Sequence, residues 1–507
     1  MFGQRHTTDN DSVSGNRNPR LVMAAALWGT ALFAAYRMFS LYRLSVDVPY
    51  WDQWNFVDFL RRSDNGLNWG EIWEAHNEHR VVVPNLVLLA LARATNWNVR
   101  AEIALTHLLI GLRFGLVFLA TWIIGRRAKQ ATWVCLPLLT ALLLTRAQAE
   151  NFMWGWQVTL TLGAVFTLLT CLFLVNGGWP RFTLAAVCSL LSQFSFASGV
   201  VVWPVGALFI AVQPGLTRRT RIIRSGVWLG VGAVATFFYR RGLLYPTKTL
   251  PRTPKLVFEY SVKFLGTPMA PLRAVPAELI AWRAGLIGLA LFAASVIGVV
   301  ATKQFTRWAA IVMWGLTAPA TAVVTALGRL GFVPMLQSMS SRYVTMSITM
   351  WAATVILFTS TILHLFGLKR AHATTSVDAA ANDGIEGIPP AATPTPPRSG
   401  PRRRLPVLAI IGTLLLCALA FASIDSANGW DAWAKRRQSD SLRDRAFLAD
   451  EAKLTPEHKS WMYPDPAMID KQRPYLIEKH LSVFRNRPTT ALARVVPTTG
   501  AAPQPLP

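Results

Sequence analysis

Residues 101–129 read AEIALTHLLIGLRFGLVFLATWIIGRRAK, an apolar run that ends in a cluster of basic residues. An α-helix of about 20 apolar residues is long enough to cross the hydrocarbon core of a bilayer. Basic residues directly after such a run are typical of the cytoplasmic end of a membrane span. This stretch therefore predicts a transmembrane helix whose C-terminal end faces the cytoplasm.

The rest of the chain repeats this pattern. Of the 507 residues, 52% are hydrophobic and only 15% are charged, whereas a soluble protein carries about a quarter charged residues. The segment 84–95 is too short to span and is predicted to lie in the membrane interface. The sequence predicts an all-α membrane protein with about 11 transmembrane helices, at residues 21–44, 100–125, 131–147, 158–176, 181–197, 200–213, 222–239, 280–302, 306–327, 343–367 and 406–424.

The formal net charge of +25 is spread over short basic clusters between apolar runs. This spacing argues against nucleic-acid binding, which needs one continuous basic patch. It favours topology signals and contacts with anionic membrane lipids. With a cytoplasmic N-terminus, the main clusters fall on the cytoplasmic side, at residues 126–129, 218–221, 303–307, 369–370 and 402–404.

The domain organisation follows from these spans. Residues 1–20 are polar and are predicted to be a disordered cytoplasmic N-terminus. Residues 21–367 form the predicted membrane domain, with a large first outer loop at 45–83. Residues 368–405 are rich in Ala, Pro and Thr and predict a flexible cytoplasmic linker. The last span, 406–424, leads to an extracytoplasmic tail, 425–507, part of which is expected to fold against the membrane domain.

The first outer loop opens with the segment PYWDQWNFVDFLRR, residues 49–62, which has the apolar periodicity of an amphipathic helix. Asp52 shares one face of that helix with other polar residues, while tryptophans occupy another. Asp52 is a candidate catalytic residue because it directly follows the first span beside aromatic anchors. The alternatives are a helix cap or an ordinary ion pair with an arginine.

Residues 76–80, HNEHR, place His76, His79 and Arg80 on one face if the segment is helical. Three interpretations remain open: a metal site completed by Asp52 or Glu78, recognition of phosphate and hydroxyl groups, or a polar interfacial helix without chemistry. The zinc-protease pattern H-E-x-x-H is absent. A divalent metal is therefore not favoured, and no cofactor is expected.

A second polar and aromatic segment, ENFMWGWQ, spans residues 150–157. Tryptophans beside amide and carboxylate groups suit sugar rings, although an aromatic belt at the membrane interface looks the same in sequence. Arginines at the predicted outer helix ends suit an anionic headgroup, or they extend to lipid phosphates. The candidate substrate-binding residues are Arg80, Glu150, Asn151, Trp154, Trp156, Gln157, Arg240, Arg329, Arg342 and Tyr343.

Taken together, the chain over about residues 20–365 resembles the GT-C class of integral membrane glycosyltransferases. The segments YWDQW, HNEHR, ENFMWGWQ, GRLGF and SRY are also similar to an uncharacterised bacterial group of multispanning proteins. Several GT-C families carry a paired acidic dipeptide in the first loop, whereas here Asp52 is followed by Gln53. The resemblance implies a GT-C-like fold in the bacterial cytoplasmic (inner) membrane.

The resemblance also implies a reaction. The donor is a polyprenyl-phosphate-linked sugar, and the acceptor is a cell-envelope glycan or lipid on the extracytoplasmic side. In this scheme Asp52 is the base, and Arg80, Arg329 and Arg342 stabilise the leaving phosphate with help from His76 or His79. No nucleotide-sugar site is expected, because no Gly-rich phosphate loop follows a strand.

Two other functions remain open. A transporter or flippase of a lipid-linked glycan needs a polar path through the bilayer, whereas the predicted spans contain few ionisable residues at mid-depth, His107 being one exception. A glycan polymerase or ligase would use the same outer arginines and histidines without a carboxylate base. Identifying the donor, and whether a bond is made or broken, separates the three functions.

Overall fold

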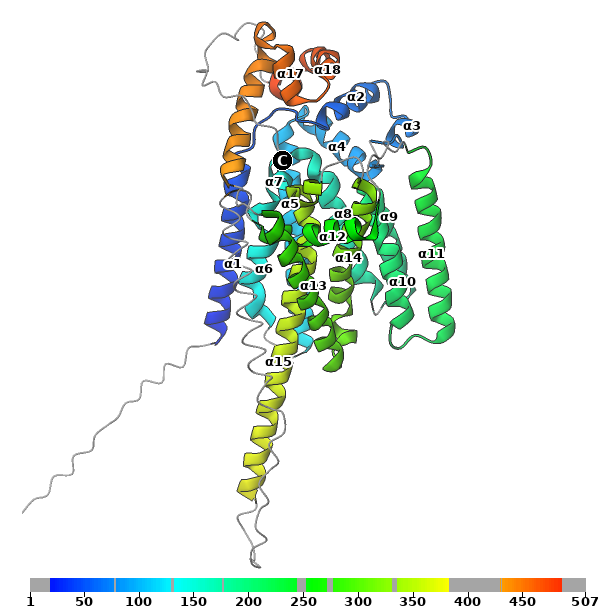
Figure 1. Ribbon diagram of the computed structural model, residues 1–507, viewed down its shortest axis with the longest axis vertical. Helices are drawn as coiled ribbons and strands as arrows, with labels where there is room; N and C mark the ends of the chain where they lie inside the picture. The colour runs from blue at the N-terminus through cyan, green and yellow to red at the C-terminus, as the bar shows by residue number, and fades with distance from the viewer. Residues whose placement is uncertain are drawn as a thin grey trace, which may run out of the picture.

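The computed structural model describes residues 19–76, 79–128, 132–175, 177–243, 252–270, 277–330, 335–382, 429 and 431–485. Figure 1 shows the helices gathered into a bundle, with α2, α3, α17 and α18 at one end. Within the described residues the β structure is limited to isolated bridge residues, among them His76 and His79, which pair with each other. The predicted all-α class is confirmed.

Six helical segments of the described chain are long and apolar enough to cross a membrane. The predicted number of about 11 is not supported, although the membrane character is. The six segments are Val99–Arg127 (α5), Gly155–Leu174 (α8 with its preceding turn), Arg218–Arg240 (α11), Ala277–Ala301 (α13), Phe305–Arg329 (α14) and Ser341–Phe366 (the start of α15).

Three of the predicted spans form shorter helices. They are α6 (Leu136–Leu143), α9 (Trp179–Gln193) and α10 (Val202–Val212), and α6 and α10 each follow a 3₁₀ turn. Even α9, with 15 residues, rises only about 22 Å, which is less than the hydrocarbon thickness of about 30 Å. Predicted span 21–44 forms helix α1, Pro19–Tyr42, whose side chains are described in part. Predicted span 406–424 lies outside the described residues.

Helix α15 runs from Val344 to Asn382, past the predicted start of the linker at 368. The residues that extend it include several alanines, leucine, lysine and arginine, all good helix formers. The first glycine beyond the helix is Gly384 and the first proline is Pro389. Residues 368–382 are therefore helical where a flexible linker was predicted, the rest of that linker lies outside the described residues, and Figure 1 shows α15 projecting beyond the bundle.

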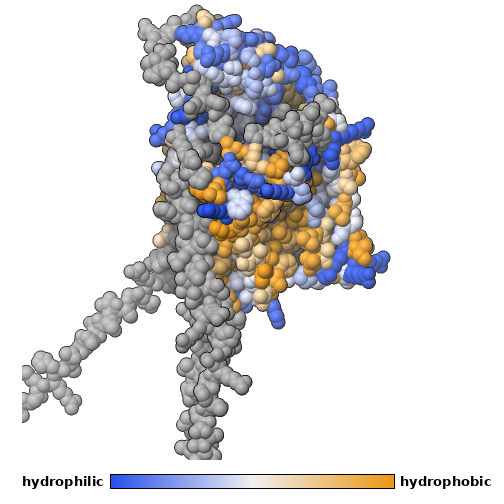
Figure 2. All heavy atoms as spheres, viewed as in Figure 1, coloured by the Kyte–Doolittle hydropathy of each residue, from blue (hydrophilic) through white to orange (hydrophobic). Residues whose placement is uncertain are grey.

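The bundle is held by one large apolar core in which α14 packs on α15, α8 on α9 and α12 on α13. Trp228, Trp308, Trp314 and Trp351 are fully buried in it. Large apolar side chains on α1 and α11 are instead exposed, as expected for surfaces that face lipid. Figure 2 shows hydrophobic residues over the bundle and hydrophilic residues over the end that carries α17 and α18.

That end, which we call the loop face, is formed by the first loop and the tail. The loop contributes α2 (Gln53–Ser63), α3 (Trp69–Ile72) and α4 (Val82–Thr95), and the tail contributes α17 (Pro456–Met462), α18 (Pro466–Glu478) and a helix over residues 431–449. Helix α2 confirms the helix predicted within 49–62. Apolar residues of α2, α4, α17 and α18 share a second core, so residues 448–484 fold against the first loop.

Short elements connect these helices. They are α7 (Ala149–Met153) and α12 (Pro254–Gly266), with 3₁₀ turns η1 (Thr132–Cys135), η2 (Arg146–Gln148), η3 (Gly155–Gln157), η4 (Ala197–Val201), η5 (Thr267–Met269), η6 (Met335–Met339), η7 (Ser341–Tyr343), η8 (Glu451–Lys453) and η9 (Ser482–Phe484). Two of them, α7 and η7, carry Glu150 and Arg342, whose charges act on Tyr50 of the first loop.

Candidate functional site

Asp52 occupies the N-cap position of α2, and its side chain makes no capping hydrogen bond. Its carboxylate Oδ1 lies 3.5 Å from Nε2 of His76. No arginine of the described chain forms an ion pair with Asp52. The two structural explanations weighed for Asp52, a helix cap or an arginine pair, therefore do not account for its position.

The backbone on both sides of Asp52 is tied down. Trp51 has a positive φ of 48°, a conformation that costs a bulky residue about 1–3 kcal/mol. Its N–H donates to the Met462 carbonyl of the tail at 3.1 Å. On the other side, Gln53 Nε2 donates to buried Glu102 at 2.5 Å. The tail and α5 together fix where the Asp52 carboxylate lies.

His76 and His79 do not lie on a helix, the arrangement that would have placed them on one face with Arg80. Their backbones pair with each other, His76 N–H to His79 O at 2.8 Å and His79 N–H to His76 O at 2.9 Å. The two rings contact different aromatic neighbours. His76 packs on Trp156 with ring centroids 4.7 Å apart, and His79 packs on Phe196 at 5.1 Å. Glu78 lies outside the described residues.

Two arginines from the ends of α14 and α15 complete the cluster. Arg329 Nη2 lies 3.4 Å from Nε2 of His79. The Arg342 backbone N–H donates to Glu150 Oε2 at 2.9 Å. This contact with Glu150 is made by the backbone of Arg342 and not by its guanidinium. The Arg342 guanidinium lies over the Tyr343 ring, and its Nε is buried without a hydrogen-bond partner. We call Asp52, His76, His79, Arg329 and Arg342 the loop-face cluster.

The surroundings of the cluster shift the pKa values of Asp52 and His79. Burial alone raises the pKa of Asp52, but the attraction of His76, Arg342 and His79 outweighs it and lowers the pKa below its usual value. Burial, with repulsion from Arg329 and His76, lowers the pKa of His79 to about 3. At neutral pH the cluster therefore holds an ionised Asp52 and a neutral His79 beside two arginines.

Such an arrangement has two chemical capacities. An ionised carboxylate can accept a proton from a hydroxyl or stabilise positive charge near it. Guanidinium groups bind phosphate through charge-assisted hydrogen bonds and stabilise charge that develops on a leaving group. The loop-face cluster combines both at the border between the membrane spans and the first loop.

Arg80 is not available to this cluster. It is 5% exposed, and its Nε donates to the Tyr239 carbonyl at 2.8 Å. Its two terminal nitrogens donate to the carbonyls of Trp73 and Arg241. The guanidinium thus joins the first loop to the end of α11, and this role replaces the predicted contact with a lipid phosphate.

Replacing Arg80 by methionine is expected to lower the Tm of the purified protein by several degrees. Three carbonyls lose charged donors, and the loss at the buried Tyr239 contact alone costs about 1–3 kcal/mol. Arg80→Lys should rescue little, because an ammonium lacks the fork that reaches several acceptors. Arg307→Met, on an exposed arginine, is the control. An unchanged Tm with weaker binding of polyprenyl phosphate would restore the substrate-binding interpretation.

The segment 150–157 packs against the cluster and holds the backbone of Arg342. Glu150 accepts from Ser340 and Arg342, and Asn151 Nδ2 donates to the Arg342 carbonyl at 3.0 Å and to Thr345 Oγ1 at 2.7 Å. Trp154, Trp156 and Gln157 are buried, with Trp154 Nε1 donating to the Tyr50 carbonyl. These residues form a packed wall, and their predicted stacking on a sugar would require the first loop to open.

The last two predicted residues are Arg240, on α11, and Tyr343, whose ring lies under the Arg342 guanidinium. Arg240 is exposed at the end of α11. Tyr343 is buried and stacks on Phe264 with ring centroids 5.3 Å apart. Its place in the sequence, next to Arg342, made it a candidate, but its ring serves to anchor the start of α15.

Sequence reasoning missed two ionisable residues of α5. Glu102 is 1% exposed and accepts from Gln53 and from Trp97 Nε1 at 2.7 Å, which positions the start of α2. Arg113 is 5% exposed in the middle of the same helix. The signal was present, because a charged residue well inside an apolar run is rare and marks a functional position by default.

The depressed pKa of His79 predicts acid sensitivity. The unfolded chain binds a proton on this histidine below about pH 6.5, whereas burial keeps the native side chain neutral down to about pH 3. Since the unfolded state binds more protons in this window, stability is lost as the pH falls from 6.5 toward 3. Tm measured between pH 7.5 and 5 should fall less in His79→Asn than in the wild type. The exposed-histidine control His480→Asn should retain the wild-type slope, and equal slopes in all three proteins would contradict the assignment.

Among the described residues, no three or more His, Cys, Asp or Glu side chains lie close enough together to hold a metal ion. The metal interpretation of residues 76–80 thus gains no third ligand from this part of the chain. Comparison with known proteins adds no assignment. No protein-family model, curated protein or solved structure matches the chain.

Proposed function

We propose that the protein is a GT-C-like glycosyltransferase that moves a sugar from a polyprenyl-phosphate donor to a cell-envelope glycan or lipid. The observation that carries this proposal is the loop-face cluster, in which the ionised Asp52 lies under the influence of Arg342. Arg329 joins the same cluster through His79. A hydroxyl acceptor and a lipid phosphate need these two kinds of group side by side.

In the proposed reaction the acceptor hydroxyl attacks the anomeric carbon of the donor sugar. Asp52 takes the hydroxyl proton as the new carbon–oxygen bond forms. The bond between the anomeric carbon and the phosphate oxygen breaks, and its electron pair leaves with the polyprenyl phosphate. Arg329 and Arg342 stabilise the negative charge on that phosphate. One displacement inverts the configuration at the anomeric carbon.

The direction of the site follows from the placement of the basic residues. Arg126 and Arg127 end α5, whose other end contacts the first loop through Asp47. Arg218 and Arg219 begin α11, whose other end contacts Arg80. Basic helix ends therefore gather opposite the loop face, which favours an extracytoplasmic loop face and a cytoplasmic N-terminus in a bacterial cytoplasmic membrane.

A second candidate function, transport of a lipid-linked glycan, is favoured by one observation. Arg113 lies at the middle of span α5, beside a cavity lined by hydroxyl groups. Mid-membrane polar groups are typical of transporters. Together with His107, Arg113 gives α5 a second ionisable side chain within the span, so the two functions need a direct test.

The test uses the purified full-length protein in lipid vesicles with synthetic short-chain polyprenyl phosphates carrying a radiolabelled hexose or pentose, and an extracted cell-envelope fraction as the acceptor. The proposal expects label in the acceptor and free polyprenyl phosphate in equal amounts. Movement of the labelled lipid across the bilayer with its glycosidic bond intact would favour the transporter instead. Consumption only of lipid-linked oligosaccharides would favour a polymerase or ligase.

A further inference from the structure

Arg113 is a buried cation at the centre of a membrane span. It is equally far in sequence from Val99 and Arg127, the two ends of α5, and its residue is 5% exposed. A charged side chain at this depth is costly unless it is paired or faces a polar cavity. The described chain gives Arg113 no carboxylate: its polar contacts are with Thr345, Thr349 and Trp314.

These contacts use only part of the guanidinium. Nη1 donates to the Thr345 carbonyl at 2.8 Å, and Nη2 donates to Thr349 Oγ1. The guanidinium carbon lies 5.4 Å from the centre of the Trp314 ring. Nε is buried and has no hydrogen-bond partner. The neutral groups around Arg113 therefore satisfy some of its donors but leave its charge uncompensated.

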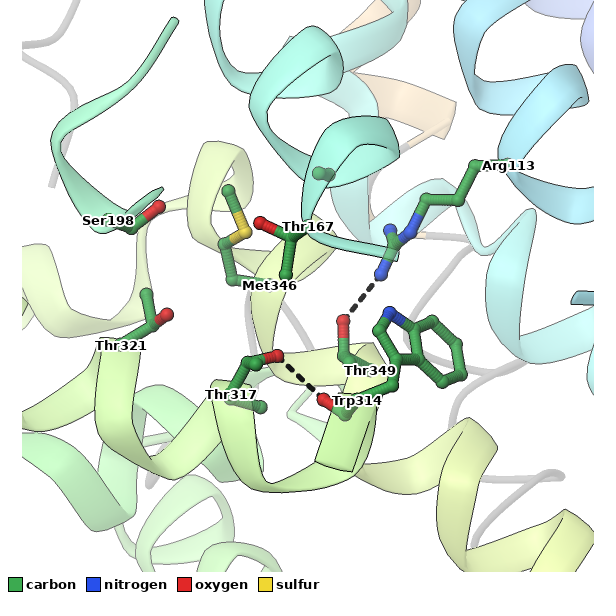
Figure 3. A pocket seen from close by; sticks show the side chains of 10 residues that line it. Arg113, Thr167, Ser198, Trp314, Thr317, Thr321, Met346 and Thr349 are labelled. Atoms are coloured by element: carbon green, nitrogen blue, oxygen red, sulfur yellow. Dashed lines mark hydrogen bonds between the residues drawn. The ribbon is translucent and has the colours of Figure 1, made fainter. Parts of the chain in front are cut away.

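A small cavity lies beside this side chain, between α5, α8, α14, α15 and η4. Besides Arg113, its polar lining consists of the hydroxyl-bearing side chains Thr167, Ser198, Thr317, Thr321 and Thr349. Figure 3 shows these hydroxyl groups arranged around one space, with the Arg113 guanidinium at its edge. No hydrogen bond links Ser198 or Thr321 through its hydroxyl to another described residue, so both can donate into the cavity.

The size and chemistry of the cavity restrict its occupant. The centre of a water-sized sphere can move within about 10 Å³ of it, which leaves room for one sphere somewhat larger than water, such as a chloride or bromide ion, but not for a phosphate, sulfate or carboxylate group. Thr317 and Thr349 donate their hydroxyls to backbone carbonyls, so the donors left for an occupant are the Arg113 guanidinium and the hydroxyls of Ser198 and Thr321, and the lining contains no carboxylate. A water molecule would satisfy some of these donors, but only an anion also compensates the Arg113 charge. A single monatomic anion fits both requirements.

We propose that the Arg113 cavity binds one halide ion, chloride being the common one, which neutralises the guanidinium and joins α5 to α8, α14 and α15. This site is separate from the loop-face cluster and does not rest on the proposed function, because its occupancy is measured without any substrate. An anion there stabilises the native packing of the spans, since it binds the folded chain and not the unfolded one.

The experiment measures the Tm of the purified full-length protein in sodium chloride, sodium bromide and sodium gluconate at equal ionic strength. We expect Tm to rise and saturate with either halide but not with gluconate. In Thr321→Val, which keeps Arg113 and its bonds, the half-saturating halide concentration should increase about tenfold or more. The same substitution at the exposed Thr183 should leave it unchanged.

Arg113→Gln should abolish the halide response, and because this variant can fail to fold, Thr321→Val carries the test independently. Bromide also permits direct location, as an anomalous-scattering peak between Arg113 and Thr321 in crystals grown with it. An equal rise of Tm in gluconate, a halide response unaffected by Thr321→Val, or a cavity that holds only water would each overturn the proposal.

Discussion

Replacing Asp52 by asparagine is expected to lower the rate of sugar transfer by about 10³-fold, the usual range for removing a general base. The amide keeps the size of the carboxylate but cannot take the acceptor proton. Its loss should leave folding intact, because Asp52 neither caps α2 nor pairs with an arginine of the described chain. The measurement is the release of polyprenyl phosphate by the reconstituted variant, with Tm and membrane insertion recorded in parallel.

Asp64→Asn is the matched control for this variant. Asp64 lies just past the other end of α2 and interacts with Tyr475 and Lys479 of the tail, away from the loop-face cluster. Its substitution should leave the transfer rate within about twofold of the wild type, as for a surface position. Full activity of Asp52→Asn would remove Asp52 as the base, and an equal loss in both variants would indicate disruption of the loop instead of lost chemistry.

Replacing Arg342 by methionine is expected to lower kcat by about 10²–10³-fold, the usual effect of removing one preorganised group that stabilises developing charge. The structure makes this substitution informative. Arg342 holds Glu150 through its backbone N–H, which methionine retains, so the variant removes the guanidinium while the chain stays in place. Arg329→Met is expected to act in the same direction, and the double variant tests whether both arginines serve one phosphate.

The distinguishing readout for Arg342→Met is the split between kcat and KM, measured with the labelled polyprenyl-phosphate donor. A loss confined to kcat indicates charge stabilised in the transition state, whereas a higher KM alone indicates donor binding in the ground state. Arg307→Met, at the opposite end of the bundle, should change neither value. A variant of Arg342 with wild-type kcat and KM would exclude its guanidinium from the reaction.

The properties that the sequence predicted well are those that depend on a residue and its neighbours in the chain. Helix α2 is one example, because the period of Trp54, Val57 and the other apolar residues within 49–62 is a local pattern. The membrane character is another, since the mean hydropathy of a stretch of consecutive residues indicates whether that stretch prefers lipid or water. The predicted number of spans was wrong for the same reason. Mean hydropathy does not show where a helix ends, as α9 does at Gln193.

The candidate site could be predicted only in part. Asp52, His76, His79, Arg329 and Arg342 were all candidates, and the fold brings them together from three regions of the chain. The backbone pairing of His76 with His79 was not predictable, because so short a stretch of polar residues is equally compatible with a helix. Arg80 looked equivalent to Arg342 until its partners were known, and those include residues 159 and 161 positions away.

By itself the sequence determined an all-α membrane protein, the position of its basic clusters and a set of polar residues near the first loop. These depend on transfer of side chains between water and lipid and on short-range periodicity. The tertiary structure decided which charges meet. Some long-range contacts occupy Arg80 and surround Arg113 with hydroxyl groups, and they leave the Arg342 side chain without an ion pair among the described residues. These contacts depend on how the helices pack, and no local pattern records that packing.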